Sequence, residues 1–85
     1  MEQIKIYGTI WCPDCARAKK VFTELKVSFE WINIDQDNKS GAYVEKINNG
    51  FKSVPTIVFP DHSVLVEPSN TELGNKLKTL KSDVK

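Results

Sequence analysis

Both cysteines of the chain lie in the stretch Gly8–Cys15, GTIWCPDC, where a strand pattern gives way to a helix pattern. Isoleucines alternate with polar residues over residues 3–7, which indicates a β-strand. From Pro13 onward the apolar residues fall three or four positions apart, which is typical of one face of a helix. Proline suits a first helical turn, because its missing N–H has no partner to lose there. The stretch therefore predicts a strand, a turn from Gly8 and a helix, with Cys12 at the N-cap and Cys15 on the buried side.

The next part of the chain predicts one more helix and three more strands. Residues 28–35 carry apolar side chains on both alternating faces, which favours a strand covered by helices on each side. After a polar loop over residues 36–41, a short helix is expected to end at Asn48–Gly50. Residues 55–59 and 64–66 then read as two strands joined by a turn.

The last helix has a recognisable start. Ser69 and Glu72 form an S-x-x-E capping box, and leucines follow at one-face spacing. The element order is therefore β-α-β-α-β-β-α. It predicts an α/β fold with a mixed four-stranded sheet and helices on both faces, in which the first two strands are parallel and the closing hairpin is antiparallel.

Length and composition limit the class of protein. At 85 residues the chain has material for one core, so we expect residues 1–85 to form a single domain. Apolar residues make up 40% and charged residues 27%, an ordinary balance for a soluble protein. No window approaches the roughly 18 consecutive apolar residues of a membrane span, and the N-terminus has no secretory signal pattern. We expect a cytoplasmic protein that acts as a monomer and has no membrane partner.

The charges argue against a nucleic-acid partner. Twelve Lys and Arg residues stand against eleven Asp and Glu residues, a formal net charge of +1, and they are spread along the chain. No basic stripe able to neutralise phosphates is visible. The basic cluster Arg17, Lys19 and Lys20 is better explained as the solvated face of a helix.

The number of cysteines favours redox chemistry over a structural role. Two cysteines in a cytosolic chain do not make a disulfide scaffold, and a staple across so short a ring constrains the unfolded chain little. A structural zinc site usually needs four ligands, whereas the chain offers Cys12, Cys15 and the lone His62, which lies in a turn. We therefore expect no metal and interpret the pair as redox-active.

The two sulfurs are expected to differ. A thiolate is the nucleophile in disulfide exchange, and the positive end of the helix dipole favours negative charge at the exposed N-cap, so Cys12 is the candidate attacking group. Cys15, on the apolar stripe, is the candidate resolving thiol. Pro13 stiffens the turn, and the Asp14 carboxylate favours the helix start while repelling a thiolate at Cys12. For Trp11 two interpretations stay open, an exposed wall beside the sulfur and partial burial against the sheet.

A second motif is the SVPT stretch, Ser53–Thr56. Together with WCPDC after the first strand and the element order, it makes the chain resemble the thioredoxin superfamily, in its glutaredoxin-like branch and nearest to the mycoredoxin type. The run NNGFKSVPTIVFPDHSVLVEPSNTEL is similar to the corresponding run of that type. The resemblance spans essentially the whole chain and implies a thioredoxin/glutaredoxin fold.

The resemblance also implies an activity and a site. Proteins of this kind exchange thiols and disulfides, reducing mixed disulfides of small thiols or the disulfides of proteins. It implies Cys12 as nucleophile, Cys15 as resolving thiol, and Val54 before a cis Pro55 offering its backbone to a bound thiol peptide. No bound cofactor is implied, and a low-molecular-weight thiol serves as co-substrate. The expected partners are this small thiol and disulfide-containing proteins.

Three positions depart from the glutaredoxin pattern and weaken the expectation that glutathione is the small thiol. Thr9 stands where many members have a lysine, Asp14 replaces an aromatic residue, and EPSN replaces a Gly-Gly pair before the last helix. The start of that helix, at Ser69 and Asn70, can still hold a substrate carboxylate through free N–H groups.

Two other functions stay open. In the first, a dimer carries an iron–sulfur cluster on Cys12 of each chain and two small thiols, although the stiff Pro13 argues against it. In the second, the protein is a dedicated electron donor to one partner enzyme, such as a ribonucleotide reductase or a peroxidase.

Overall fold

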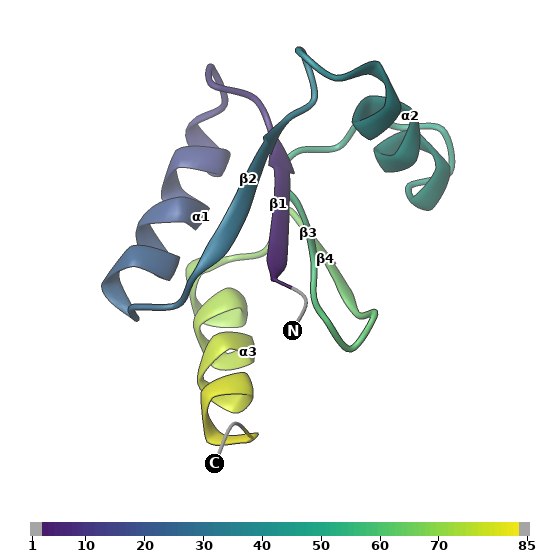
Figure 1. Ribbon diagram of the computed structural model, residues 1–85. Helices are drawn as coiled ribbons and strands as arrows, with labels where there is room; N and C mark the ends of the chain where they lie inside the picture. Colours follow the sequence, from purple (N-terminus) through teal and green to yellow (C-terminus); the bar gives the residue numbers. More distant parts are fainter. Residues whose placement is uncertain (1–2, 84–85) are drawn as a thin grey trace.

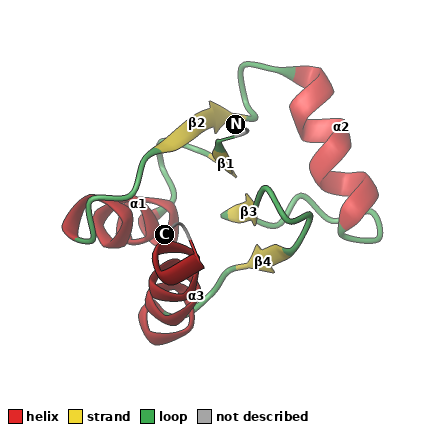
Figure 2. Ribbon diagram, turned by 60° about the horizontal axis from the view of Figure 1, so that its bottom comes forward, coloured by secondary structure: helices red, strands yellow, loops and turns green. Residues whose placement is uncertain are grey.

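The computed structural model describes residues 3–83 and has the predicted order of elements. In chain order these are β1 (Ile4–Gly8), α1 (Pro13–Glu24), β2 (Phe29–Asn33), α2 (Asn38–Ile47), β3 (Thr56–Val58), β4 (Val64–Val66) and α3 (Asn70–Asp83). The strands form one sheet in the order β2-β1-β3-β4, in which β1 and β2 are parallel and the other pairs antiparallel. Helices α1 and α3 cover one face of the sheet and α2 covers the other (Figures 1 and 2). The predicted α/β fold with a mixed sheet is confirmed.

Alternation along β1 divides the core between the two faces of the sheet. Ile4 and Ile6 point toward α1 and α3, whereas Tyr7 points toward α2. The larger cluster, under α1 and α3, contains Ile4, Ile6, Ala18, Val21, Phe22, Ile57, Phe59, Leu73 and Leu77. The smaller one contains Tyr7, Ile34 and Val44. The two faces therefore supply separate layers, and Cys15 belongs to the helix that covers the larger one.

The strands differ from their predicted bounds at the ends. Gly8 was expected in a turn but is the last residue of β1, because it pairs with Asn33 and its carbonyl accepts a hydrogen bond from the Ile34 N–H at 3.0 Å. The strand expected over residues 55–59 is shorter, Thr56–Val58, and the one expected over residues 28–35 is Phe29–Asn33.

Residues 38–41, predicted as part of a loop, form the first turn of α2. Asp37 is the N-cap, and its carboxylate accepts hydrogen bonds from the Lys39 N–H at 3.1 Å and the Ser40 hydroxyl at 2.7 Å. Because this cap satisfies the first free donors, the helix begins at Asn38. Its last residue is Ile47 and Asn48 is its C-cap, as predicted.

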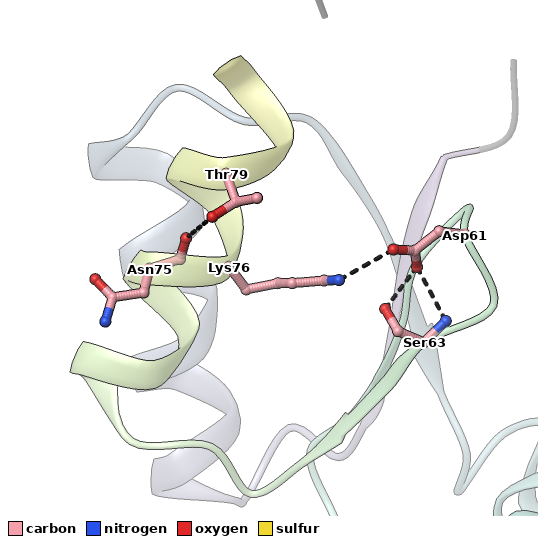
Figure 3. A network of polar contacts seen from close by, with 5 residues as sticks. All are labelled: Asp61, Ser63, Asn75, Lys76 and Thr79. Carbon is pink, nitrogen blue, oxygen red and sulfur yellow. Dashed lines mark hydrogen bonds and ion pairs between the residues drawn. The ribbon is translucent and has the colours of Figure 1, made fainter. Parts of the chain in front are cut away.

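Helix α3 is fastened to the β3–β4 hairpin by a polar network (Figure 3). The Lys76 ammonium lies 3.1 Å from Asp61 Oδ2, and the same carboxylate accepts hydrogen bonds from the Ser63 N–H and hydroxyl. Lys76 also lies 5.1 Å from the centroid of the Phe59 ring. His62, in the same turn, is exposed and has a φ of 71°, which agrees with the prediction of a surface turn residue.

The Asp61 network makes stability depend on pH at the acid end. Hydrogen bonds from Ser63, and then from Lys76, hold the pKa of Asp61 below its ordinary value of 3.8. The folded state therefore favours the carboxylate, and this stabilisation is complete above pH 3.8 and is lost as the pH falls below it. We expect the Tm of the wild type to fall more steeply than that of Asp61→Asn between about pH 5 and pH 2. Thermal unfolding followed by circular dichroism measures this, with Glu24→Gln as the control; parallel curves for wild type and Asp61→Asn would contradict it.

Within residues 3–83, no helix has the length and apolar character needed to span a bilayer.

Candidate active site

Cys12 lies where β1 has ended and α1 begins. It is the N-cap of α1, with an extended backbone (φ −90°, ψ 114°), and its Sγ accepts a hydrogen bond from the Cys15 N–H at 3.3 Å. Pro13 occupies the first helical position, as predicted. The sulfur therefore sits at the positive end of the helix dipole with a backbone donor already directed at it, an arrangement that stabilises a thiolate.

Cys12 is less open than the sequence suggested. Its exposed fraction is 8%, against 0% for Cys15. The segment before β3 covers it: the Cys12 thiol donates a hydrogen bond to the Val54 carbonyl oxygen, which lies 3.9 Å from Sγ. The prediction of an exposed Cys12 is therefore wrong: both cysteines are buried, and Cys12 keeps only the larger exposed fraction of the two. Both thiols are free.

Cys15 is a poor acid in this environment. Burial raises the pKa of its thiol to about 12. A hydrogen bond from the backbone N–H of Thr9 lowers it, the neighbouring Cys12 raises it further, and the charge of Lys19 lowers it slightly. At neutral pH the group is therefore a thiol almost entirely, which suits a residue that reacts second.

Trp11 is exposed, which rules out partial burial against the sheet, one of the two interpretations left open by the sequence. Its exposed fraction is 69%, and its indole Nε1 donates to Asp35 Oδ2 at 2.9 Å. Asp35 was not singled out from the sequence. A signal for it exists, because β1 and β2 are parallel and the residues that follow them meet at the same edge of the sheet.

The segment on the other side of Cys12 is held by hydrogen bonds. The Val54–Pro55 peptide bond is cis, as the resemblance implied, and Pro55 is buried. The Pro55 carbonyl accepts from the Glu67 N–H at 2.9 Å. The Thr56 hydroxyl donates to the Ser53 carbonyl at 2.7 Å. These contacts fix the direction in which the Val54 backbone faces Cys12.

Asp14 is paired, which changes what it does at the site. Its carboxylate lies 3.1 Å from Arg17 Nη1, and Arg17 Nη2 donates to the Pro68 carbonyl at 3.5 Å. Because a cation neutralises it, Asp14 repels a thiolate at Cys12 less than the sequence suggested. Arg17 is exposed, as predicted, and it also links the start of α1 to the segment before α3. Lys19, from the same cluster, lies 4.0 Å from the centroid of the Trp31 ring.

Ser69 and Asn70 follow Pro68, whose carbonyl accepts the hydrogen bond from Arg17. Both are exposed. The Ser69 hydroxyl accepts from the Glu72 N–H at 3.1 Å, so the predicted cap is confirmed and uses one of the free donors of α3. The contacts described for Ser69 run into its own helix and not to Cys12.

Thr9 brings no charge to the site. It is 3% exposed, and its hydroxyl has no hydrogen-bond partner among the described residues. Among residues 3–83, no group of three or more His, Cys, Asp or Glu side chains could hold a metal ion.

A model of the glutaredoxin family matches residues 4–64, which include both cysteines and the Val54–Pro55 segment. The chain belongs to the glutaredoxin family. It is 34% identical over 74 residues to a Mycobacterium tuberculosis protein with the provisional name of glutaredoxin, covering 87% of this chain and 88% of that protein. It is 31% identical over 80 residues to mycoredoxin 1 of Corynebacterium glutamicum, covering 94% and 99%. The predicted glutaredoxin and mycoredoxin resemblance is confirmed.

A solved structure agrees on the fold. Wheat glutaredoxin superimposes with a TM-score of 0.75 and 22% identity, covering 99% of this chain and 83% of that one. Its identity to this chain is low enough that the match speaks for the thioredoxin-like fold alone. Glutaredoxin-family membership supports a general thiol–disulfide oxidoreductase role for this chain.

Proposed function

We propose that this glutaredoxin-family protein reduces mixed disulfides of a low-molecular-weight thiol, and protein disulfides, with Cys12 as the nucleophile. The observation that carries the proposal is the position of Cys12 Sγ, at the N-cap of α1, 3.3 Å from the Cys15 N–H and 3.9 Å from the Val54 carbonyl. The helix end supplies stabilisation for a thiolate. The Val54 backbone supplies an edge against which an extended thiol peptide can lie.

The reaction follows from this geometry. The Cys12 thiolate attacks one sulfur of the substrate disulfide, forming a bond between them while the other sulfur leaves as a thiolate. The mixed disulfide on Cys12 is then resolved by one of two thiolates. Attack by Cys15 forms the Cys12–Cys15 disulfide and releases the bound thiol; attack by a second small thiol releases free Cys12 and a small disulfide.

Near Cys12, residue 9 has no charge with which to form a salt bridge to a substrate, so other contacts must hold the substrate. Thr9 is buried and neutral, and the positive charge of Arg17 is already paired with Asp14. Trp11, exposed and fixed by Asp35, offers an aromatic surface beside the sulfur. We further propose that the protein works in the reducing cytoplasm, a compartment that keeps such thiol pairs reduced.

Trapping the intermediate tests the function. A Cys15→Ser variant cannot resolve a mixed disulfide internally, so a bound thiol stays on Cys12. We expect intact-mass spectrometry to find one adduct per chain after incubation with glutathione disulfide or with the oxidised small-thiol pool of the source cells. The Cys12→Ser/Cys15→Ser double variant, treated in the same way, controls for reaction elsewhere. Absence of an adduct on Cys12 from every disulfide tried would overturn the proposal.

A further inference from the structure

The Cys15 sulfur occupies a recess that exists because residue 8 has no side chain. A β-carbon built on Gly8 would lie 2.6 Å from Cys15 Sγ and 2.8 Å from Cη2 of Trp31. Non-bonded carbon atoms pack at about 3.5 to 4.0 Å, so such a β-carbon cannot be accommodated without movement. Cys15 is 0% exposed, which leaves its sulfur no open solvent to move into.

Residues of β1, β2 and α1 surround the Cys15 sulfur and hold one another in place. Gly8 pairs with Asn33 of β2, and its carbonyl accepts from the Ile34 N–H at 3.0 Å, so the backbone of β1 cannot retreat without breaking this pair. Trp31 comes from β2, and the Lys19 ammonium of α1 lies 4.0 Å from its ring centroid, a cation–π contact. The sulfur therefore packs against a fixed backbone and a restrained ring.

A backbone donor reaches the sulfur inside this recess. The backbone N–H of Thr9, the residue after Gly8, hydrogen-bonds to Cys15. The position of this donor depends on the course of the chain where β1 ends. A shift of the sulfur away from residue 8 would therefore lengthen the one backbone contact that favours the Cys15 thiolate.

We propose that Gly8 is a positioning residue for the resolving thiol: it lets β1 and Trp31 fix the Cys15 sulfur where it can attack Cys12. The inference rests on the proposed function. In the resolving step, the Cys15 thiolate forms a bond to the Cys12 sulfur, the bond from Cys12 to the bound thiol breaks, and that thiol leaves as a thiolate. The proton that Cys15 loses goes to solvent. A reacting atom misplaced by about 1 Å can cost about 100-fold in rate, and an added methyl group at residue 8 requires a shift of that order.

Stopped-flow absorbance with an aromatic disulfide whose thiol is coloured separates the two steps. Attack by Cys12 releases the first coloured thiol, and resolution by Cys15 releases the second. For Gly8→Ala we expect the second phase to slow by about 10- to 100-fold and the first to stay within about twofold of wild type. Gly74→Ala is the matched control, because a β-carbon there meets nothing within 4 Å, and neither phase should change. An unchanged second phase in folded Gly8→Ala would overturn the proposal.

A second measurement decides which neighbour requires a glycine at residue 8, the Cys15 sulfur or the Trp31 ring. The loss of Tm caused by Gly8→Ala is compared in the wild type and in a Cys15→Ala background. We expect a smaller loss in Cys15→Ala, where the sulfur is gone; if Gly8→Ala fails to fold, Cys15→Ala should restore folding. An equal loss in both backgrounds, or failure to fold in both, would assign the recess to Trp31 and sink the proposal.

The stopped-flow assay also distinguishes this inference from the proposed function. If wild type shows no first phase, Cys12 is not the nucleophile and the proposed function fails. If the first phase is normal in every variant and the rate of the second phase is the same in Gly8→Ala as in wild type, the inference about Gly8 fails. The proposed function then stands.

Discussion

Resolution of a mixed disulfide by Cys15 will accelerate about tenfold for each unit of pH between about 7 and 9, a hundredfold in all, because only the thiolate attacks. Burial raises the pKa of the Cys15 thiol to about 12. This main cause remains when Cys12 carries a substrate, although the hydrogen bond from the Cys15 thiol to the Cys12 sulfur, which also raises this pKa, is then altered. Far below the pKa, each added unit of pH multiplies the thiolate fraction by ten.

The second phase of the coloured-disulfide assay measures this dependence directly. The first phase, recorded in a Cys15→Ser variant in the same buffers, is the control for the pH dependence of the leaving group and of Cys12. A second phase that begins to level off near pH 9 would contradict the prediction, since it would place the pKa of Cys15 near its ordinary value of 9.0 in the reacting state.

The burial of Cys15 has a consequence for the route of the reaction. At neutral pH its thiolate is scarce, so a small external thiol competes well for the mixed disulfide on Cys12. Close positioning beside Gly8 favours the internal route, and the high pKa opposes it. We expect the external thiol to complete a growing share of turnovers at neutral pH as its concentration rises.

The parts of the site that lie close in sequence were predictable. Cys12 and Cys15 are three residues apart, and an N-cap followed by proline predicts both the helix start and the N–H directed at the sulfur. The hydrogen bond from the Glu72 N–H to the Ser69 hydroxyl is equally local, and this half of the capping box was predicted correctly. In both cases one turn of helix contains donor and acceptor, so the spacing alone determines the contact.

The contacts that local spacing alone could not predict join distant segments. Trp11 and Asp35 are 24 residues apart, Cys12 and Val54 are 42 apart, and Arg17 reaches the carbonyl of Pro68 across 51 residues. Each depends on how the sheet aligns its strand ends, and side-chain types do not encode that alignment. The partial burial of Cys12 was missed for this reason.

The recess at Gly8 was missed for a different reason. A glycine near a strand end is usually read as part of a turn, and here the same residue closes the strand while making room for a sulfur. The requirement becomes visible only when Trp31 and Cys15, from different elements, are placed beside it.

Phe22→Ala will lower the free energy of unfolding by about 3 to 5 kcal/mol, the usual loss for a buried phenylalanine. Phe22 is 0% exposed and lies in the larger core cluster between α1 and the sheet. Its ring meets that of Phe29 edge to face, with centroids 5.1 Å apart. Small domains are stable by only about 5 to 15 kcal/mol, so the variant should be partly unfolded at moderate temperature.

Urea unfolding measures the loss, and Phe51→Ala supplies the matched control. Phe51 has the same side chain but is 69% exposed, so its removal leaves no cavity and should change stability by no more than about 0.5 kcal/mol. Because Phe22 lies on the same helix as Cys15, loosening of α1 should also slow the second phase of the disulfide assay before the chain unfolds. A loss below about 1 kcal/mol for Phe22→Ala would mean that this core repacks around the missing ring, and that α1 does not hold Cys15 as rigidly as the recess at Gly8 requires.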